Sequence, residues 1–290
     1  MSITAKDVAE LRARTGAGMM DCKRALEEAG GDLPRAIELL RAKGIAKAEK
    51  RSGRTTSQGL VAGLVGPEGS RGAMLQLTCE TDFVARTEDF GRAADEMAAL
   101  LLERMPAGLE AFLALPLGTG TVADRVKELS GKTGEGVSLP HAVTFDAGAG
   151  GVVGLYLHHN RLAGGMVELS APGDAARRPE TRELARELAL HVVSAVPLAV
   201  RGEDIPAEVL ERERRIAEEQ VAGEGKPENI RPKIVEGKLR KFVAEQSLLE
   251  QPWVKDEKKP VKQLVQDTGH AIGAELTVTR FVRIRVGEVG

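Results

Sequence analysis

An internal repeat constrains the fold of this 290-residue chain more than any other feature of its sequence. When Gly59 is placed on Gly151, an offset of 92 residues, a series of residues matches without a gap. The matching pairs are Val61 with Val153, Gly72 with Gly164, Met74 with Met166, Leu77 with Leu169 and Asp82 with Asp174. Self-similarity at a fixed offset is typical of one structural unit built twice, so we predict two similar subdomains.

Each copy begins with two apolar runs and continues with a longer segment of helical periodicity. Alternating apolar runs are typical of strands, and a short break between two of them favours an antiparallel pair. The predicted strands cover residues 60–65 with 74–79 and 152–157 with 166–170, and the predicted helices cover 88–103 and 180–195.

The repeat resumes farther along at an offset of 139 residues, where Val122 falls on Val261 and Val143 falls on Val282. Each copy therefore adds a helix and a third strand, and we predict an α+β fold with two three-stranded antiparallel subdomains. The two offsets differ by 47 residues, so the second copy contains an insertion of about that size. Residues 206–250 are charge-rich, with apolar residues at helical spacing, which predicts an antiparallel helical hairpin. Because the hairpin is too polar and narrow for a core of its own, it should project from the body.

The segment before the repeat reads as three short helices over residues 4–14, 20–29 and 33–43, separated by glycines. Thr4 with Asp7 resembles a capping box, and Asp32 is a suitable N-cap for the third helix. The predicted domains are a three-helix N-terminal module with a basic linker (1–55), a first core subdomain (56–148), a second core subdomain (149–205 with 251–290) and the inserted hairpin (206–250).

Composition excludes several classes of protein. With 42% hydrophobic residues, 29% charged residues and a net charge of -2, the chain is an ordinary globular protein and lacks the basic balance of most nucleic-acid binders. No apolar run approaches the length of a bilayer span, and the first residues do not resemble a signal peptide. Cys22 and Cys79 are too far apart to suggest a disulfide framework or a zinc site. We therefore expect a cytoplasmic protein.

A search for catalytic motifs gives no candidate. Residues 131–133 read Gly-Lys-Thr like the end of a phosphate-binding loop, but Val126 stands where that loop needs a glycine. The five histidines show no metal-binding spacing, and His191 is expected to be a core histidine rather than a general base. We predict a protein that is not an enzyme and needs no cofactor and no metal.

Three apolar side chains are candidates for contact with a partner instead. Phe83 follows the second strand of the first copy, whereas the equivalent position of the second copy is Ala175. The architecture therefore does not require an aromatic residue there, and Phe83 is a candidate for insertion into a partner's pocket rather than a packing residue. Met19 and Met20 are adjacent at a helix start, so at least one of them should be exposed.

Two motifs of the chain resemble those of a known protein family. The sequences TGAGMMDCK at residues 15–23 and CETDFVA at residues 79–85 closely resemble the bacterial translation elongation factor Ts family. The order of a three-helix (UBA-like) module, a duplicated core and an inserted hairpin also matches that family over essentially the whole chain. Two departures are Glu80, where glutamine is common, and the absence of a short helical tail after residues 286–290.

The resemblance implies a guanine-nucleotide exchange factor that binds elongation factor Tu in its GDP form and releases the nucleotide so that GTP can bind. It implies that the turn from Thr81 to Val84 enters the GTPase near its magnesium site, with Phe83 wedged between helices. The implied contact residues are Thr81, Asp82, Phe83 and Val84 at the magnesium site, His158 in support of the wedge, and Met19 and Met20 against a helix beside the nucleotide pocket. The second half of the core would hold a distant domain of the partner.

Two alternatives use other parts of the chain. An RNA-binding module would use the basic residues 41–54, but this segment has no aromatic side chain on which bases could stack. An enzyme would need a site that the sequence does not reveal. We expect no membrane and no direct nucleic-acid partner, and the sequence leaves a homodimer open.

Overall fold

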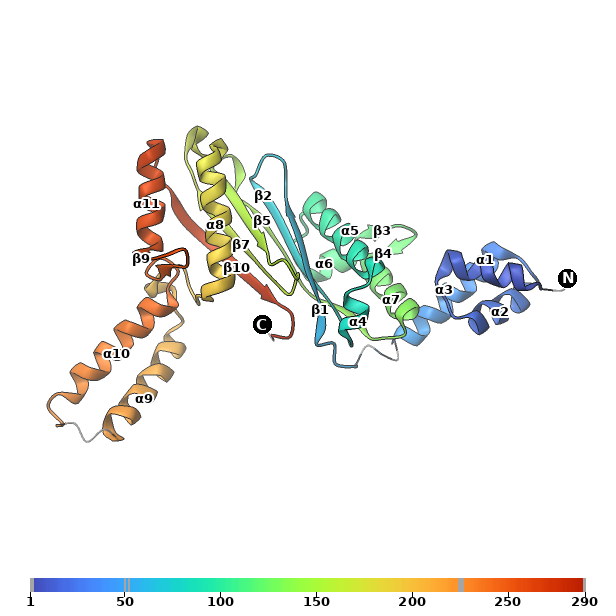
Figure 1. Cartoon of the computed structure of the whole chain (residues 1–290), viewed down its shortest axis with the longest axis horizontal. Coiled ribbons are helices and arrows are strands. Elements are labelled where there is room, and N and C mark those ends of the chain that lie inside the picture. The colour runs from blue at the N-terminus through green and yellow to red at the C-terminus, as the bar shows by residue number, and fades with distance from the viewer. Residues whose placement is uncertain (1–2, 50, 52, 224–226, 289–290) are drawn as a thin grey trace.

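The structure is a computed structural model that describes residues 3–49, 51, 53–223 and 227–288. The molecule is elongated, with three N-terminal helices at one end, two sheets in the middle and a helical hairpin at the other end (Figure 1). The predicted α+β class is confirmed. In the described part of the chain, no helix is both long and apolar enough to cross a bilayer.

The N-terminal module consists of α1 (Ala5–Thr15), α2 (Met19–Glu28) and α3 (Leu33–Glu49). Thr4 and Asp7 form the predicted capping box of α1, and Asp32 accepts a hydrogen bond from the N–H of Arg35. The helices bury a small apolar core formed by Val8, Leu11, Cys22, Ala25, Leu26, Ala29 and Ala36.

The predicted end of α3 at residue 43 is wrong, because the helix continues to Glu49. Gly44, which directly follows the predicted end and is a typical helix stop, lies against Gly131 of α7 (Val122–Thr133), and a Cβ on Gly131 would lie 3.0 Å from the Gly44 Cα. A glycine inside a helix costs about 1 kcal/mol relative to alanine, but here it allows two backbones to approach closely. Tertiary packing therefore overrides the local stop signal.

The first subdomain has a sheet in the order β1-β2-β5, with all neighbours antiparallel. Its strands are β1 (Gln58–Val65), β2 (Arg71–Cys79) and β5 (Val137–Asp146). One face is covered by α5 (Glu88–Arg104), α6 (Leu109–Leu113) and α7, and β3 (Pro116–Leu117) and β4 (Gly120–Thr121) form a small ribbon before α7.

The second subdomain repeats this plan with the sheet order β10-β7-β6. Its strands are β6 (Gly151–Leu157), β7 (Ala163–Ser170) and β10 (Thr277–Arg285), and its main helices are α8 (Pro179–Ala195) and α11 (Val261–Ile272). Short elements connect them: η1 (Gly148–Gly150), η2 (Gly173–Arg177), η3 (Gly202–Asp204), β8 (Pro252–Trp253) and β9 (Asp256–Pro260).

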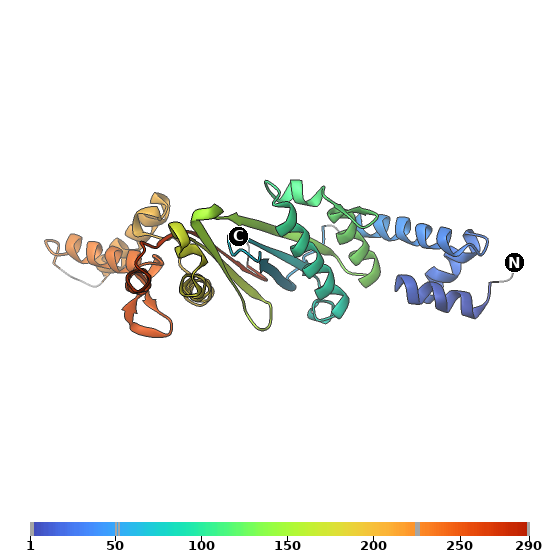
Figure 2. The same ribbon diagram turned by 90° about the horizontal axis from the view of Figure 1, so that it is seen from above.

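The two sheets pack against each other, with α8 on one side and α5 and α7 on the other (Figures 1 and 2). Residues from both copies share the interface core, namely Val61, Met74, Phe145, Val153, Met166 and Ile284. The contact is reciprocal. The N–H of Val61 donates to the Arg161 carbonyl and the N–H of Val153 donates to the Gly69 carbonyl, both at 2.7 Å, and both pairs are related by the offset of 92 residues. The duplication is thus visible as an approximate two-fold arrangement.

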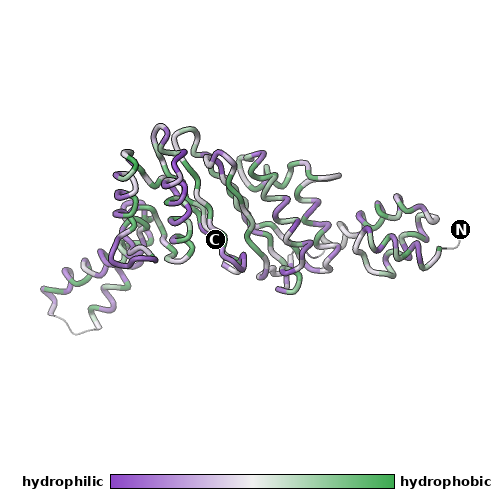
Figure 3. Tube along the Cα trace, turned by 45° about the horizontal axis from the view of Figure 1, so that its top comes forward, coloured by the Kyte–Doolittle hydropathy of each residue, from purple (hydrophilic) through white to green (hydrophobic). Residues whose placement is uncertain are grey.

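The inserted hairpin consists of α9 (Ala207–Gly223) and α10 (Arg231–Gln246), which project from the second subdomain (Figure 1). Its residues are mostly hydrophilic, with a few apolar positions in both helices (Figure 3). We expected no core within the hairpin, and this expectation is wrong, because Ala217, Val221, Val235 and Leu239 are buried between its two helices.

Candidate functional site: the turn after β2 and the cleft beside it

Phe83 lies on α4 (Asp82–Ala85), a single helical turn between β2 and α5. Thr81 is its N-cap, and the Thr81 hydroxyl accepts from the N–H of Val84 at 3.4 Å. The Phe83 side chain is 81% exposed, whereas Val84 and Ala85 pack partly against the core of the first subdomain. The prediction that Phe83 is exposed and not a packing residue is confirmed.

Asp82 lies beside Phe83 and pairs with Arg86 at 3.0 Å. The Arg86 side chain is largely exposed and the Asp82 side chain about half exposed, and a surface pair of this kind contributes at most about 1 kcal/mol. The Asp82 carboxylate can therefore exchange Arg86 for another partner at little cost.

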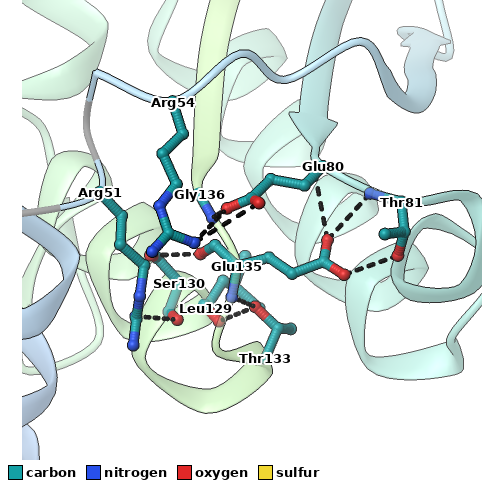
Figure 4. A network of polar contacts seen from close by, with 9 residues as sticks. All are labelled: Arg51, Arg54, Glu80, Thr81, Leu129, Ser130, Thr133, Glu135 and Gly136. Atoms are coloured by element: carbon teal, nitrogen blue, oxygen red, sulfur yellow. Dashed lines mark hydrogen bonds and ion pairs between the residues drawn. The ribbon is translucent and has the colours of Figure 1, made fainter.

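A carboxylate that sequence analysis missed holds this turn from below (Figure 4). Glu135 follows α7 and accepts three hydrogen bonds: from the N–H of Glu80 at 3.1 Å, from the N–H of Thr81 at 3.0 Å and from the Thr81 hydroxyl at 2.6 Å. Charge-assisted bonds of this kind are stronger than neutral ones. The only sequence signal is that the second copy has Ala274 at the equivalent position.

The Glu80 side chain reaches in the opposite direction. Its carboxylate accepts from the N–H of Gly136 at 2.5 Å and from the Arg54 guanidinium at 3.1 Å. These two contacts, the Gly136 bond foremost, lower the pKa of the Glu80 carboxyl. The linker after α3 is thus tied to the end of β2.

Cys79 completes the support of the turn. Its thiol is buried and donates to the Thr81 carbonyl at 3.1 Å. Burial, reinforced by the nearby Glu135 carboxylate, raises the pKa of Cys79 to about 11. The thiol therefore remains protonated and keeps its role as a donor near neutral pH.

His158 lies in the loop between β6 and β7, where its Nδ1 is 3.1 Å from the Tyr156 hydroxyl and its ring lies beside that of His159. Arg161 fixes this loop. Its backbone is left-handed (φ 57°), and its guanidinium pairs with Asp95 of α5 and donates to the Val61 carbonyl at 3.3 Å. The loop of the second subdomain is thereby fastened to the first.

A cleft of about 500 Å³ separates the turn from this loop. Asp82 and Arg86 line one side, and His159, Asn160 and Arg161 line the other. The structure therefore brings Asp82 and the His158 loop to one cleft. Phe83 and His158 are sequence neighbours of residues in its lining but do not themselves line it.

Met19 and Met20 lie apart from this cleft, at the start of α2 in the N-terminal module (Figure 1). They are 53% and 62% exposed, so the expectation of at least one exposed methionine is confirmed for both. Their position relative to the core is set by the packing of α3 on α7, which the ion pair between Arg41 and Glu128 supports.

The basic segment at residues 41–54 does not form a free cationic stripe in the part whose side chains the structure describes. Lys43 pairs with Glu28, Arg51 donates to the Ser130 carbonyl at 2.9 Å and Arg54 binds Glu80. The Lys43 pair lies within the N-terminal module, whereas Arg51 and Arg54 connect the linker to the core. These three cations therefore have partners within the chain.

The remaining titratable candidates have structural surroundings. His191 is fully buried, its Nδ1 accepts from the N–H of Val254 at 3.3 Å, and its Nε2 donates to Gln251 at 2.9 Å. The prediction of a core histidine is confirmed. Within the described ranges, no three His, Cys, Asp or Glu side chains are grouped so that they could hold a metal ion.

Comparison with known proteins places these features in context. The family model described as "Elongation factor TS" matches residues 80–288. A protein named elongation factor Ts from Symbiobacterium thermophilum is 45% identical over 287 residues, which cover 99% of this chain and 92% of the relative. Proteins of the same name from Alkalilimnicola ehrlichii and Aquifex aeolicus are 44% and 42% identical, with 99% of this chain and 93% and 99% of the relatives covered. The similarity therefore extends over nearly the whole chain.

Proposed function

The chain belongs to the elongation factor Ts family, and we propose that it acts in translation elongation as the guanine-nucleotide exchange factor of elongation factor Tu. It binds the GTPase in its GDP form, accelerates release of GDP and thereby allows GTP to bind. Its place of action is the cytoplasm, where its partner works. It acts by protein binding, without covalent chemistry.

The observation that carries the mechanism is the exposed Phe83 next to Asp82 on a turn that the Glu135 carboxylate holds through three hydrogen bonds. GTPases hold GDP largely through a phosphate-binding loop and a magnesium ion. Phe83 inserts between helices of the GTPase near the magnesium site, and the turn from Thr81 to Val84 occupies the space beside it. The magnesium ion is displaced, and the phosphates lose one of their principal ligands.

Two further surfaces support this insertion. The loop that carries His158 lies across the cleft from Asp82, so it can contact the same region of the GTPase as the turn. Met19 and Met20, exposed at the start of α2, contact a helix beside the nucleotide pocket. Flexible thioethers suit such a contact because they adapt to an irregular surface.

Linkage sets the thermodynamic requirement for exchange. The factor must bind nucleotide-free elongation factor Tu more tightly than the GDP complex, and GDP must then weaken the binding of the factor by the same ratio. An exchange factor therefore needs a contact surface that competes with magnesium and nucleotide. The Phe83 turn supplies such a surface.

The test is release of fluorescent GDP from purified elongation factor Tu, measured with and without this protein at several magnesium concentrations. We expect faster release, with an acceleration that falls as free magnesium rises, because magnesium and the turn compete. If the folded protein leaves the release rate unchanged at every magnesium concentration, exchange activity is refuted. Acceleration that is independent of magnesium would retain exchange but refute displacement of the ion.

A further inference from the structure

The carboxylate of Glu135 lies under the turn that carries Phe83 and binds its backbone (Figure 4). We propose that Glu135 is a positioning residue for exchange: it fixes the orientation in which Phe83 is presented to the GTPase. This inference rests on the proposed function, but it concerns a residue that does not itself have to touch the partner.

The turn needs such a support because its own packing is weak. Phe83 is 81% exposed and makes little contact with the core, and α4 contains only four residues. Of the turn, only Val84 and Ala85 pack partly against the apolar core. The direction of the Phe83 side chain therefore depends on the polar contacts at the start of the turn.

Glu135 controls those contacts. One of its oxygens accepts the N–H groups of Glu80 and Thr81, and the other accepts the Thr81 hydroxyl at 2.6 Å. Because the hydroxyl proton points toward Glu135, a lone pair of the same oxygen can face the N–H of Val84 and cap α4. The carboxylate thus orients both the backbone before Phe83 and the N-cap of its helix.

The support is reciprocal. While the Glu135 side chain binds the backbone of residues 80 and 81, the Glu80 side chain binds the backbone N–H of Gly136 at 2.5 Å. Each loop therefore holds the other, as Figure 4 shows. Arg54 adds a further bond to Glu80, which connects the linker from the N-terminal module to the same unit.

Glu135 is itself held in place by the end of α7. Its carbonyl accepts from the Ser130 hydroxyl at 2.5 Å, and its N–H donates to the Thr133 hydroxyl at 3.3 Å. Ser130 is buried, and its own carbonyl accepts from Arg51. The backbone from which the carboxylate extends is therefore preorganised, which lowers the entropy cost of ordering the turn.

The second copy of the repeat serves as an internal comparison. Ala274 stands in place of Glu135, and Gly173 stands in place of Thr81. The equivalent 3-10 helix, η2, has no side-chain hydrogen bond at its N-cap, and Ala175 at the Phe83 position is buried. The carboxylate support is present in the copy whose turn exposes an aromatic residue and missing in the other.

The first experiment compares Glu135→Ala and Glu135→Gln with the wild type in the fluorescent GDP release assay, over a range of factor concentrations. We expect Glu135→Ala to lower the rate at saturation about tenfold, because a misplaced group loses rate steeply. Glu135→Gln should retain at least about half of the rate, because its amide oxygen can still accept the two N–H groups. Equal saturating rates for Glu135→Ala and the wild type would overturn the inference.

A double-mutant cycle with Phe83→Ala separates positioning from general damage. If Glu135 acts through Phe83, adding Glu135→Ala to Phe83→Ala should change the saturating rate by less than about twofold. A further tenfold loss in that background would show that Glu135 acts by another route. If the wild type itself does not accelerate release, the proposed function fails instead.

A third measurement is independent of elongation factor Tu. Hydrogen exchange of the Glu80 and Thr81 amides should be at least about tenfold faster in Glu135→Ala than in the wild type, and close to wild type in Glu135→Gln. Unchanged exchange at both amides would refute the support of the turn. Should Glu135→Ala fail to fold, Glu135→Asp takes its place, because its side chain is one methylene too short to reach all three donors.

Discussion

The interface between the two sheets allows a sharp test of the duplicated architecture. Gly164 of β7 faces the first subdomain, and a Cβ at this position would lie 2.8 Å from Met74 Sδ, 2.9 Å from Leu157 Cδ2 and 3.0 Å from Val61 Cγ1. Ordinary contacts between such atoms lie at about 3.5 to 4.0 Å. Gly164→Ala therefore overpacks the interface and should lower the free energy of unfolding by about 1 to 3 kcal/mol.

The partner residue provides the second arm of a double-mutant cycle. Met74 is fully buried, so Met74→Ala should cost about 2 to 5 kcal/mol through lost transfer energy and the cavity that remains. In the double variant, the new methyl at residue 164 occupies space that the Met74 sulfur has left. The combined loss should therefore be smaller than the sum of the single losses by at least about 1 kcal/mol.

The assay is urea unfolding of all variants at equilibrium, and Gly150→Ala is the control because a Cβ there would meet nothing within 4 Å. The repeat predicts the same destabilisation by Gly72→Ala, where the Cβ would lie 2.6 Å from Val153 Cγ1 and 2.8 Å from Met166 Sδ. Because the Val153 contact remains when Met166 is truncated, the relief in that double variant should be smaller. Losses that add within about 0.5 kcal/mol for Gly164→Ala with Met74→Ala would refute this close packing.

Three other predictions follow from single side chains. Burial lowers the pKa of His191 below 6.5, so its contribution to stability should be complete above about pH 6.5 and fall at lower pH, with a slope of at most about 1.4 kcal/mol per pH unit. In urea titrations at several pH values, His191→Asn should lack this pH-dependent component. A variant with the same pH profile as the wild type would contradict the prediction. In a Cys22→Ser background, Cys79 should react with an aromatic disulfide reagent at pH 8 only after unfolding, because a pKa of about 11 leaves about one thiolate in a thousand. Rapid reaction of the native protein would contradict the burial of this thiol. Arg161→Gly keeps the left-handed backbone but loses the ion pair with Asp95. It should therefore reduce the saturating GDP release rate several-fold while the protein remains folded. A wild-type rate would show that exchange does not need this ion pair.

The sequence predicted the parts of the fold that depend on periodic apolar patterns. The repeat predicted both three-stranded sheets. Met74 and Met166 occupy equivalent positions in the two copies, and both face the interface between the sheets. Comparison of the two copies also predicted that Phe83 is exposed, because Ala175 showed that the architecture needs no aromatic residue there. Both inferences came from the comparison of the two copies, which needs no knowledge of contacts in the folded chain.

The parts that were missed depend on contacts between distant segments. Gly44 resembles a helix stop, and only its contact with Gly131 explains why α3 continues past it. Glu135 resembles an ordinary surface acid, because its bonds to residues 80 and 81 join segments that lie about fifty residues apart in sequence. A charged side chain gives no periodic signal, so its hydrogen-bond partners could be identified only in the folded chain.

We infer that Phe83 drives nucleotide release. The rate of GDP release from elongation factor Tu, compared at saturating Phe83→Ala and saturating wild type, tests this role. Because Phe83 is 81% exposed, the substitution should change the free energy of unfolding by less than about 0.5 kcal/mol. Burying a phenylalanine in a partner is worth about 1.5 to 3 kcal/mol, so we expect a saturating rate about 10-fold to 150-fold below that of the wild type. Equal rates for the two folded proteins would contradict the claim.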